Sequence, residues 1–273
     1  MAAQNMKEVI YPEFIALQHT CHDSIKACKG DSKFLQKCMM KCQGVTGNFP
    51  ASISGGQVSF YLQQYAEALL DFTYHDEQIL SDIDEFPAQT TKERIAQIFG
   101  YLDKINTMCE KVSPGCRLEE LLGYEIAECL LWRKGALLYG YCSTVKKDDK
   151  RLHAECQEYR QCLQKGVRYL QSLFKIRDAI LNTTHVLGEN DTLELLKMGI
   201  YSSTHLLALM YAGEMCYWYI TSANENTDSV RAARNLGMEM LDIYIQATEQ
   251  IVELKHGWSN DQAKQYLAEM KGS

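Results

Sequence analysis

The chain has 273 residues, of which 46% are hydrophobic and 23% are charged. This composition excludes an intrinsically disordered chain, and a chain of this length can bury a substantial core without disulfides or structural metals. The formal net charge of −7 argues against a binding surface for nucleic acid or for an anionic membrane.

The cysteines indicate a reducing compartment. There are 11 of them, an odd number, and several lie inside apolar runs, where a thiol behaves as a small buried hydrophobe. The N-terminal residues contain no apolar segment of the kind that a secretory signal requires. We therefore expect free thiols and a cytosolic protein.

Hydrophobic residues recur with helical spacing nearly everywhere, and no alternating strand pattern is found, so the sequence predicts an all-α fold. The first four helices are predicted at about 12–29, 32–44, 57–83 and 90–113. The fourth begins with hydroxyl-capping residues, Thr90 and Thr91. The glycine-rich stretch 44–56 predicts a loop. It separates a cysteine-rich helical hairpin with its loop, residues 1–56, from a main helical domain, 57–273, although one continuous domain over 1–273 also fits.

The second half predicts five more helices, at about 118–145, 148–181, 191–222 and 228–256, with a short one opening at Ser259. Loops are expected at 188–190 and at the charged stretch 146–151, which we interpret as solvated. The expected architecture is a compact multi-helix bundle of about eight or nine helices.

Two of these helices, at about 118–145 and 191–222, are apolar around most of their circumference and are expected at the centre of the bundle. Glycines at 135, 140, 199 and 213 lie inside them. Close approach of helices at a crossing explains such glycines better than a ligand cleft does. The run 198–220 has the length of a membrane span, but a carboxylate, Glu214, and a histidine, His205, favour a buried core helix.

A cluster of sulfur and imidazole side chains lies near the N-terminus. Cys38 and Cys42 are four residues apart, and Cys21 and Cys28 are seven apart, so each pair shares a helix face; His19 and His22 are close by. A helical hairpin could bring the four sulfurs together as a zinc site requires, but their spacing matches no known zinc motif. We therefore favour buried structural thiols over zinc or a disulfide.

A second polar set, Glu67, Asp71 and His75, repeats once per turn on one predicted helix. Di-iron bundles use two Glu-x-x-His units on separate helices, and this set supplies none. A solvated helix end is the better interpretation. The common nucleotide, hydrolase and metalloprotease motifs are also missing from the sequence, so we expect no cofactor and no catalytic residues.

The third candidate is an ion pair between the two apolar helices. Arg133 has mainly apolar helical neighbours, where an unpaired guanidinium would be costly to bury, and Glu214 is the one acid of the apolar run 198–220 in the other helix. We predict an Arg133–Glu214 pair that sets how the helices cross, with a polar binding pocket as the alternative. Trp132 and Trp218, on the same two helices, are expected to be structural.

Three strings carry a resemblance to a known family. They are Leu121–Cys142 (LLGYEIAECLLWRKGALLYGYC), Leu195–Trp218 (LLKMGIYSSTHLLALMYAGEMCYW) and, more weakly, Tyr65–Leu80 (YAEALLDFTYHDEQIL). They resemble the Rab-seven-interacting subunit family of the Mon-one–Ccz-one complex, the exchange factor for the late-endosomal GTPase Rab-seven. The resemblance is best over about 59–219 and weaker in the N-terminal hairpin and the C-terminal helices.

The resemblance implies a non-catalytic accessory protein that binds the Mon-one–Ccz-one complex and Rab-seven. It further implies support of late endosomal and lysosomal traffic and of autophagy including mitophagy, from a cytosolic pool recruited to late endosomes or damaged mitochondria. Two alternatives stay open from the residues alone. One is a helical-bundle metal-binding protein or enzyme, and the other is a helical module that binds an apolar ligand.

Overall fold

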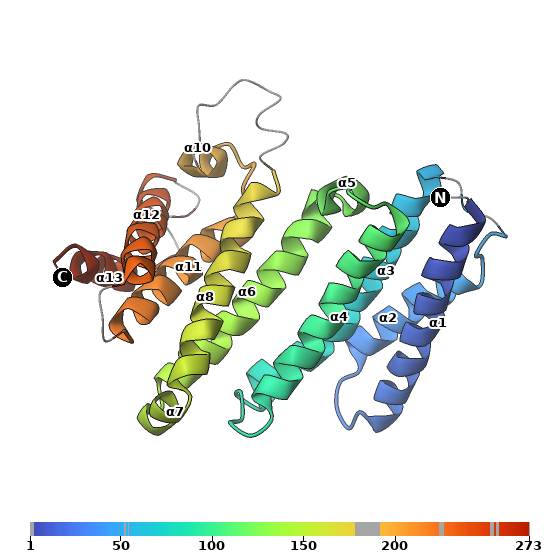
Figure 1. Cartoon of the computed structure of the whole chain (residues 1–273), viewed down its shortest axis with the longest axis horizontal. Helices are drawn as coiled ribbons and strands as arrows, with labels where there is room; N and C mark the ends of the chain where they lie inside the picture. Colours follow the sequence, from blue (N-terminus) through green and yellow to red (C-terminus); the bar gives the residue numbers. More distant parts are fainter. Residues whose placement is uncertain are drawn as a thin grey trace. The chain divides into compact units, whose positions relative to one another are not determined.

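The computed structural model describes residues 3–51, 53, 55–177, 192–223, 227–251, 254 and 257–272. These residues contain twelve α-helices, one π-helical turn and no strand (Figure 1). The all-α fold class is therefore confirmed. The chain divides into two compact units, residues 1–130 and 131–273, which are described one at a time.

The first unit is built around α3 (Gly55–Gln78), which contacts α1 (Ala3–Ala27), α2 (Lys33–Thr46), α4 (Thr91–Val112) and α5 (Leu118–Leu122). Apolar residues at helical spacing on α3 are buried on several sides, among them Leu62, Leu69 and Phe72. α3 continues directly into the π-helical turn η1 (Ile79–Ile83). Because α1 and α2 pack on α3, the predicted N-terminal hairpin shares the core of this unit. A domain boundary at residue 56 stays a prediction.

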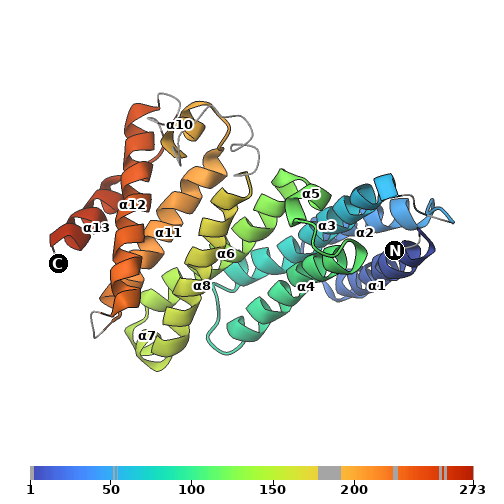
Figure 2. The same cartoon turned by 45° about the horizontal axis from the view of Figure 1, so that its top comes forward.

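The second unit contains most of α6 (Tyr124–Lys146), with α7 (Asp149–Ala154), α8 (Cys156–Lys175), α10 (Thr192–Lys197), α11 (Ser203–Thr221), α12 (Asp228–Gln250) and α13 (Asp261–Gly272). α11 contacts α8, α12 and α13, and Figure 2 shows it running beside α12. Most residues of α11 are buried, as its apolar sequence requires.

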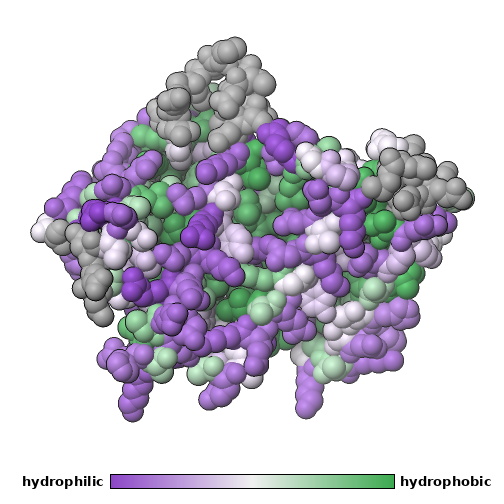
Figure 3. All heavy atoms as spheres, viewed as in Figure 1, coloured by the Kyte–Doolittle hydropathy of each residue, from purple (hydrophilic) through white to green (hydrophobic). Residues whose placement is uncertain are grey.

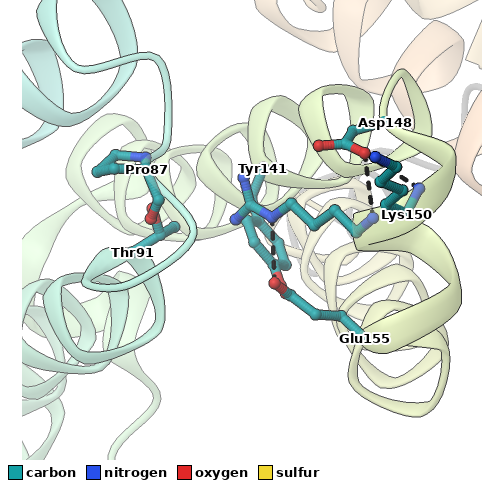
Figure 4. Close-up of polar contacts among 7 residues, drawn as sticks. Pro87, Thr91, Tyr141, Asp148, Lys150 and Glu155 are labelled. Atoms are coloured by element: carbon teal, nitrogen blue, oxygen red, sulfur yellow. Dashed lines mark hydrogen bonds and ion pairs between the residues drawn. The ribbon is translucent and has the colours of Figure 1, made fainter.

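One predicted helix start and one predicted helix cap are wrong. α1 begins at Ala3, so Pro12 lies inside the helix and is not its first residue. At the start of α4, Thr90 occupies the N-cap position but its side chain makes no capping hydrogen bond. Instead, the hydroxyl of Thr91 donates to the carbonyl oxygen of Pro87 at 2.6 Å (Figure 4). Since Thr91 is fully buried, this bond satisfies a hydroxyl that water cannot reach.

Three predicted helices each divide in two, which is why the described helices exceed the predicted eight or nine. Residues 118–145 divide at Gly123 into α5 and α6, and residues 148–181 divide at Glu155 into α7 and α8. Residues 191–222 divide into α10 and α11 around Gly199, which has a φ of +69°. Ser202 then starts α11 with a capping box in which the His205 ring accepts from the Ser202 backbone N–H.

The remaining predictions fall partly outside the described residues. The loop at 188–190 lies there, as do the predicted ends at Leu181 and His256. Where the chain is described, α12 ends at Gln250 and α13 begins at Asp261, close to the capping residues predicted from Ser259 onward. None of the described helices combines the length and apolar character needed to cross a membrane.

Gly123 separates α5 from α6 and takes a backbone conformation that other residues rarely adopt. Gly123 has φ +80° and ψ 160°, a backbone conformation that is essentially restricted to glycine. A Cβ at this position would meet only the end of the Gln63 side chain, at 3.9 Å, so the cost of substitution is backbone strain and not crowding. We expect Gly123→Ala to lower the free energy of unfolding by about 1–3 kcal/mol. Urea denaturation followed by circular dichroism measures this, and an unchanged midpoint would contradict the conformation.

Candidate functional site

The two helices that carry the resemblance meet along a row of stacked aromatic side chains. The row consists of Trp132 and Tyr139 on α6 and Tyr211 and Trp218 on α11. Tyr139 and Tyr211 stack with ring centroids 3.7 Å apart and planes only 6° apart. Trp132 stacks on Tyr211 at 5.5 Å, and Trp218 stacks on Tyr139 at 5.3 Å. We call these four residues the aromatic row; such pairs add to the stability gained from burial alone.

Glu214 lies buried beside the aromatic row, with only 4% of its surface exposed. The hydroxyl of Tyr139 donates to its Oε2 at 2.6 Å. Burial raises the pKa of Glu214 above its usual value, while the Tyr139 hydrogen bond and the charge of Lys146 act in the opposite direction. The carboxylate is therefore kept in the interior by a tyrosine hydroxyl and a nearby ammonium group.

Lys146 extends the stacked arrangement from α6 toward α13. Its Nζ lies 5.0 Å from the ring centroid of Trp218 and 5.5 Å from that of Tyr266, and it donates to the Tyr266 hydroxyl at 3.3 Å. Tyr266 in turn stacks on Tyr217 at 4.0 Å. The cation thus lies between two aromatic rings, an arrangement that stabilises a half-buried lysine.

The sequence predicted Arg133 as the partner of Glu214, whereas the partners found are Tyr139 and Lys146. Arg133 is half-buried, and the next residue, Lys134, is the buried cation of this helix, 4% exposed. Lys134 places its Nζ 5.5 Å from the ring centroid of Tyr169 on α8. Lys134 was not singled out from the sequence, because a helix that is apolar around most of its circumference does not show whether Arg133 or Lys134 faces the interior.

Several glycines mark close helix packing in the second unit. A Cβ at Gly135 would lie 2.5 Å from the side chain of Leu170 on α8, and one at Gly213 would lie 2.4 Å from Leu241 on α12. One at Gly237 on α12 would lie 2.7 Å from the Cβ of Cys216. At Gly135 and Gly213 the space that a side chain would fill holds a neighbouring leucine, so helix packing accounts for these glycines and leaves no ligand cleft at either. Gly199 lies between α10 and α11, outside both helices.

The charged stretch after α6 is more ordered than the predicted solvated loop. Asp148 caps α7 by accepting from the backbone N–H groups of Lys150 and Arg151. Glu155 accepts from the Tyr141 hydroxyl at 2.5 Å and from Arg151 Nε at 3.1 Å (Figure 4). The Arg151 side chain is 9% exposed and lies over the Tyr141 ring. A shielded charge cluster therefore ties α6 to the break between α7 and α8.

Three of the four cysteines in the predicted cluster come together between α1 and α2. Cys21, Cys38 and Cys42 are fully buried, and the Cys21 thiol donates to the carbonyl oxygen of Leu35 at 2.8 Å. A hydrogen bond with Cys38 lowers the pKa of Cys21, while bonding to the neighbouring thiols and burial raise that of Cys38. Cys28 lies elsewhere, with its thiol toward the carbonyl oxygens of Gly30 and Asp31. No metal-holding group of His, Cys, Asp or Glu occurs among the described residues.

The structure does not bring Glu67, Asp71 and His75 together in one site. Lys41 on α2 pairs with Asp71 at 2.8 Å and with Glu67 at 3.3 Å. Burial lowers the pKa of Lys41, but the two carboxylates outweigh this effect and raise it. His75 is buried one turn further along α3. The two acids therefore join α2 to α3 through a lysine and are not part of a metal site with His75.

The chain is similar to a protein family over most of its length. Residues 52–271 match the model of the RAB7A-interacting MON1-CCZ1 complex subunit 1 family. A relative of that name from Danio rerio is 34% identical over 214 residues, covering 76% of this chain and 77% of the relative. The Homo sapiens relative is 33% identical over 225 residues, with 76% of each chain covered. No solved structure matches.

The match is wider than the three strings indicated. It reaches residue 271, so α12 and α13 follow the family pattern, and the weak C-terminal resemblance predicted from the sequence is corrected. α1 and α2 precede the matched residues. With this coverage and identity, the chain belongs to the RAB7A-interacting MON1-CCZ1 complex subunit 1 family.

Proposed function

We propose that this chain is a non-catalytic binding subunit that contacts the MON1-CCZ1 complex and RAB7A, as the names of its relatives state. The observation that carries the proposal is the family match over residues 52–271. The second unit supports it in part, because the polar side chains of Tyr139, Glu214 and Lys134 there are held in contacts between helices. The resemblance extends the proposal to late endosomal and lysosomal traffic, autophagy and mitophagy, and to a cytosolic protein recruited to those organelles.

We infer that the two apolar segments, at about 118–145 and 191–222, form an interior scaffold, and that partners bind elsewhere. Arg133, Glu214, Trp132 and Trp218 are then structural residues, a role supported by the stacking and hydrogen bonding of the aromatic row. Among the residues that the structure describes, the exposed large hydrophobic side chains lie outside both segments except for one. They are Met40, Phe60, Tyr74, Ile83 and, within the second segment, Met198. The face in Figure 3 likewise shows hydrophobic residues scattered among hydrophilic ones.

A pull-down tests the proposal. The chain, carrying an affinity tag, is expressed in cells next to a matched Gly213→Val variant, which is designed to disturb the packing of α11 on α12. We expect the MON1 and CCZ1 proteins and RAB7A to be enriched with the unmodified chain, and less so with the variant. Enrichment of none of the three by a folded, well-expressed chain would contradict the proposal.

A further inference from the structure

The first unit contains a cavity of about 500 Å³ that the proposed function does not use. It lies between the end of α1 with its turn into α2 and the end of α3 with η1, and a volume of this size is within the range of small-molecule sites. The lining residues used below are Cys28, Lys29, Asp31, His75, Asp76 and Ile83.

The wall of the cavity carries a buried imidazole with no protein partner. His75 is 8% exposed, and within the described part of the chain its ring makes no hydrogen bond. The ring nitrogens are not among the fully enclosed side-chain atoms that lack a partner, so they are accessible. Because His75 lines the cavity, a group bound there can form a hydrogen bond with them.

Asp76 adds a carboxylate to the same cavity. It is half-buried, and no hydrogen bond or ion pair to its side chain occurs among the described residues. Burial raises the pKa of Asp76, and the charges of His75 and Arg94 oppose that rise. Arg94 is itself paired with Asp84 at 2.5 Å. The Asp76 carboxylate is therefore poorly solvated and not neutralised by a contact of its own.

The other lining residues indicate which chemical groups the ligand carries. Asp31 uses Oδ1 to accept from the backbone N–H of Lys33, which leaves its other oxygen for a ligand. Lys29 is the one cationic side chain of the lining, against two carboxylates, and it is exposed. Ile83, 73% exposed, supplies an apolar surface. The combination fits a cation with several N–H donors on an aliphatic stem.

We propose that the cavity bounded by Cys28, His75 and Asp76 is a binding site for a guanidinium group on an aliphatic stem. The guanidinium donates to the Asp76 carboxylate and lies against the His75 ring, and its stem lies along Ile83. The ligand is an arginine side chain of a partner or a free guanidino compound. The inference does not depend on the proposed function, since it concerns charge and shape in the first unit alone.

The test compares two blocked amino acids of nearly the same shape. N-acetyl-arginine methylamide and its citrulline counterpart, which lacks the charge, are titrated separately into the full-length chain by isothermal calorimetry and by NMR. We expect millimolar or tighter binding of the arginine probe, binding of the citrulline probe at least tenfold weaker, and shifts at His75. Equal binding of both probes, or binding of neither, would overturn the proposal.

Variants then locate the site. Asp76→Asn should weaken binding of the arginine probe at least tenfold, whereas Glu110→Gln, the same charge change at an exposed position of α4, should leave it unchanged. An equal effect of both variants would overturn the assignment, and so would an unaffected Asp76→Asn. If Asp76→Asn does not fold, the arginine–citrulline comparison decides.

Two further probes distinguish the sources of the ligand. A glycine-flanked arginine peptide that binds more tightly than agmatine supports a partner side chain, and the reverse supports a free guanidino compound.

Discussion

Replacing Gly213 with valine is expected to lower the free energy of unfolding by about 3 kcal/mol. A Cβ at this position would lie 2.4 Å from Cδ2 and 2.5 Å from Cγ of Leu241, and 3.4 Å from its backbone nitrogen. Leu241 is fully buried, so its side chain cannot move into solvent. The helices α11 and α12 must therefore separate or Leu241 must leave its rotamer, and either change disrupts a close-packed core.

Chemical denaturation followed by circular dichroism measures the effect, and Gly100→Ala is the matched control. Gly100 lies on the exposed side of α4, where a Cβ would meet nothing within 4 Å. Because alanine is the better helix former, this control should gain about 0.5–1 kcal/mol. Adding Leu241→Ala to Gly213→Val should cost less than the sum of the two single changes. A Gly213→Val variant as stable as the unmodified chain would show that α11 and α12 do not approach this closely.

Replacing Tyr139 with phenylalanine is expected to cost about 1–3 kcal/mol at neutral pH, because it removes the hydroxyl that donates to buried Glu214 while keeping the stacked ring. Tyr211→Phe is the control. The Tyr211 ring stacks in the same row, but its hydroxyl makes no hydrogen bond within the described residues, so we expect a change below about 0.5 kcal/mol. Equal effects of the two substitutions would contradict the assigned role of Tyr139.

The pH dependence of the same variants follows from the raised pKa of Glu214. The folded state holds this proton more tightly than the unfolded state, so stability falls as pH rises from the unfolded pKa through the folded one. As the pH rises through this interval, the free energy of unfolding of Glu214→Gln should therefore increase relative to that of the unmodified chain. Tyr139→Phe removes a contact that lowers the pKa, so its cost should be smallest in acid and largest above the folded pKa. A cost independent of pH would contradict this.

The helical content could be predicted from the sequence, but not where the helices break. Apolar spacing located the helices. Because this spacing continues across short interruptions, it does not show where one helix ends and the next begins. It cannot register that the chain takes a positive φ at Gly123 or Gly199, because neither residue changes the apolar stripe on its two sides. The start of α1 was missed because Pro12 resembles a first-turn proline, whereas the helix already begins at Ala3.

The candidate site was identified in part. Glu214 was chosen from the sequence as a partner for Arg133, and the structure buries Glu214 with a different partner. The partner was sought among cations, but a tyrosine hydroxyl satisfies a carboxylate equally well, and Tyr139 could not be chosen without knowing which residues of α6 face α11. One residue along a helix is a rotation of about 100°. That rotation separates half-buried Arg133 from buried Lys134.

Reconstitution from purified components tests the central claim, that this chain is a binding subunit, most directly. The chain is mixed at micromolar concentration with the MON1-CCZ1 complex and RAB7A from Danio rerio, and the mixture is separated by size-exclusion chromatography, with the Danio rerio relative as the positive control. We predict that the chain co-elutes with the complex, as the relative does. Separate elution of a folded chain, under conditions in which the relative co-elutes, would contradict the account.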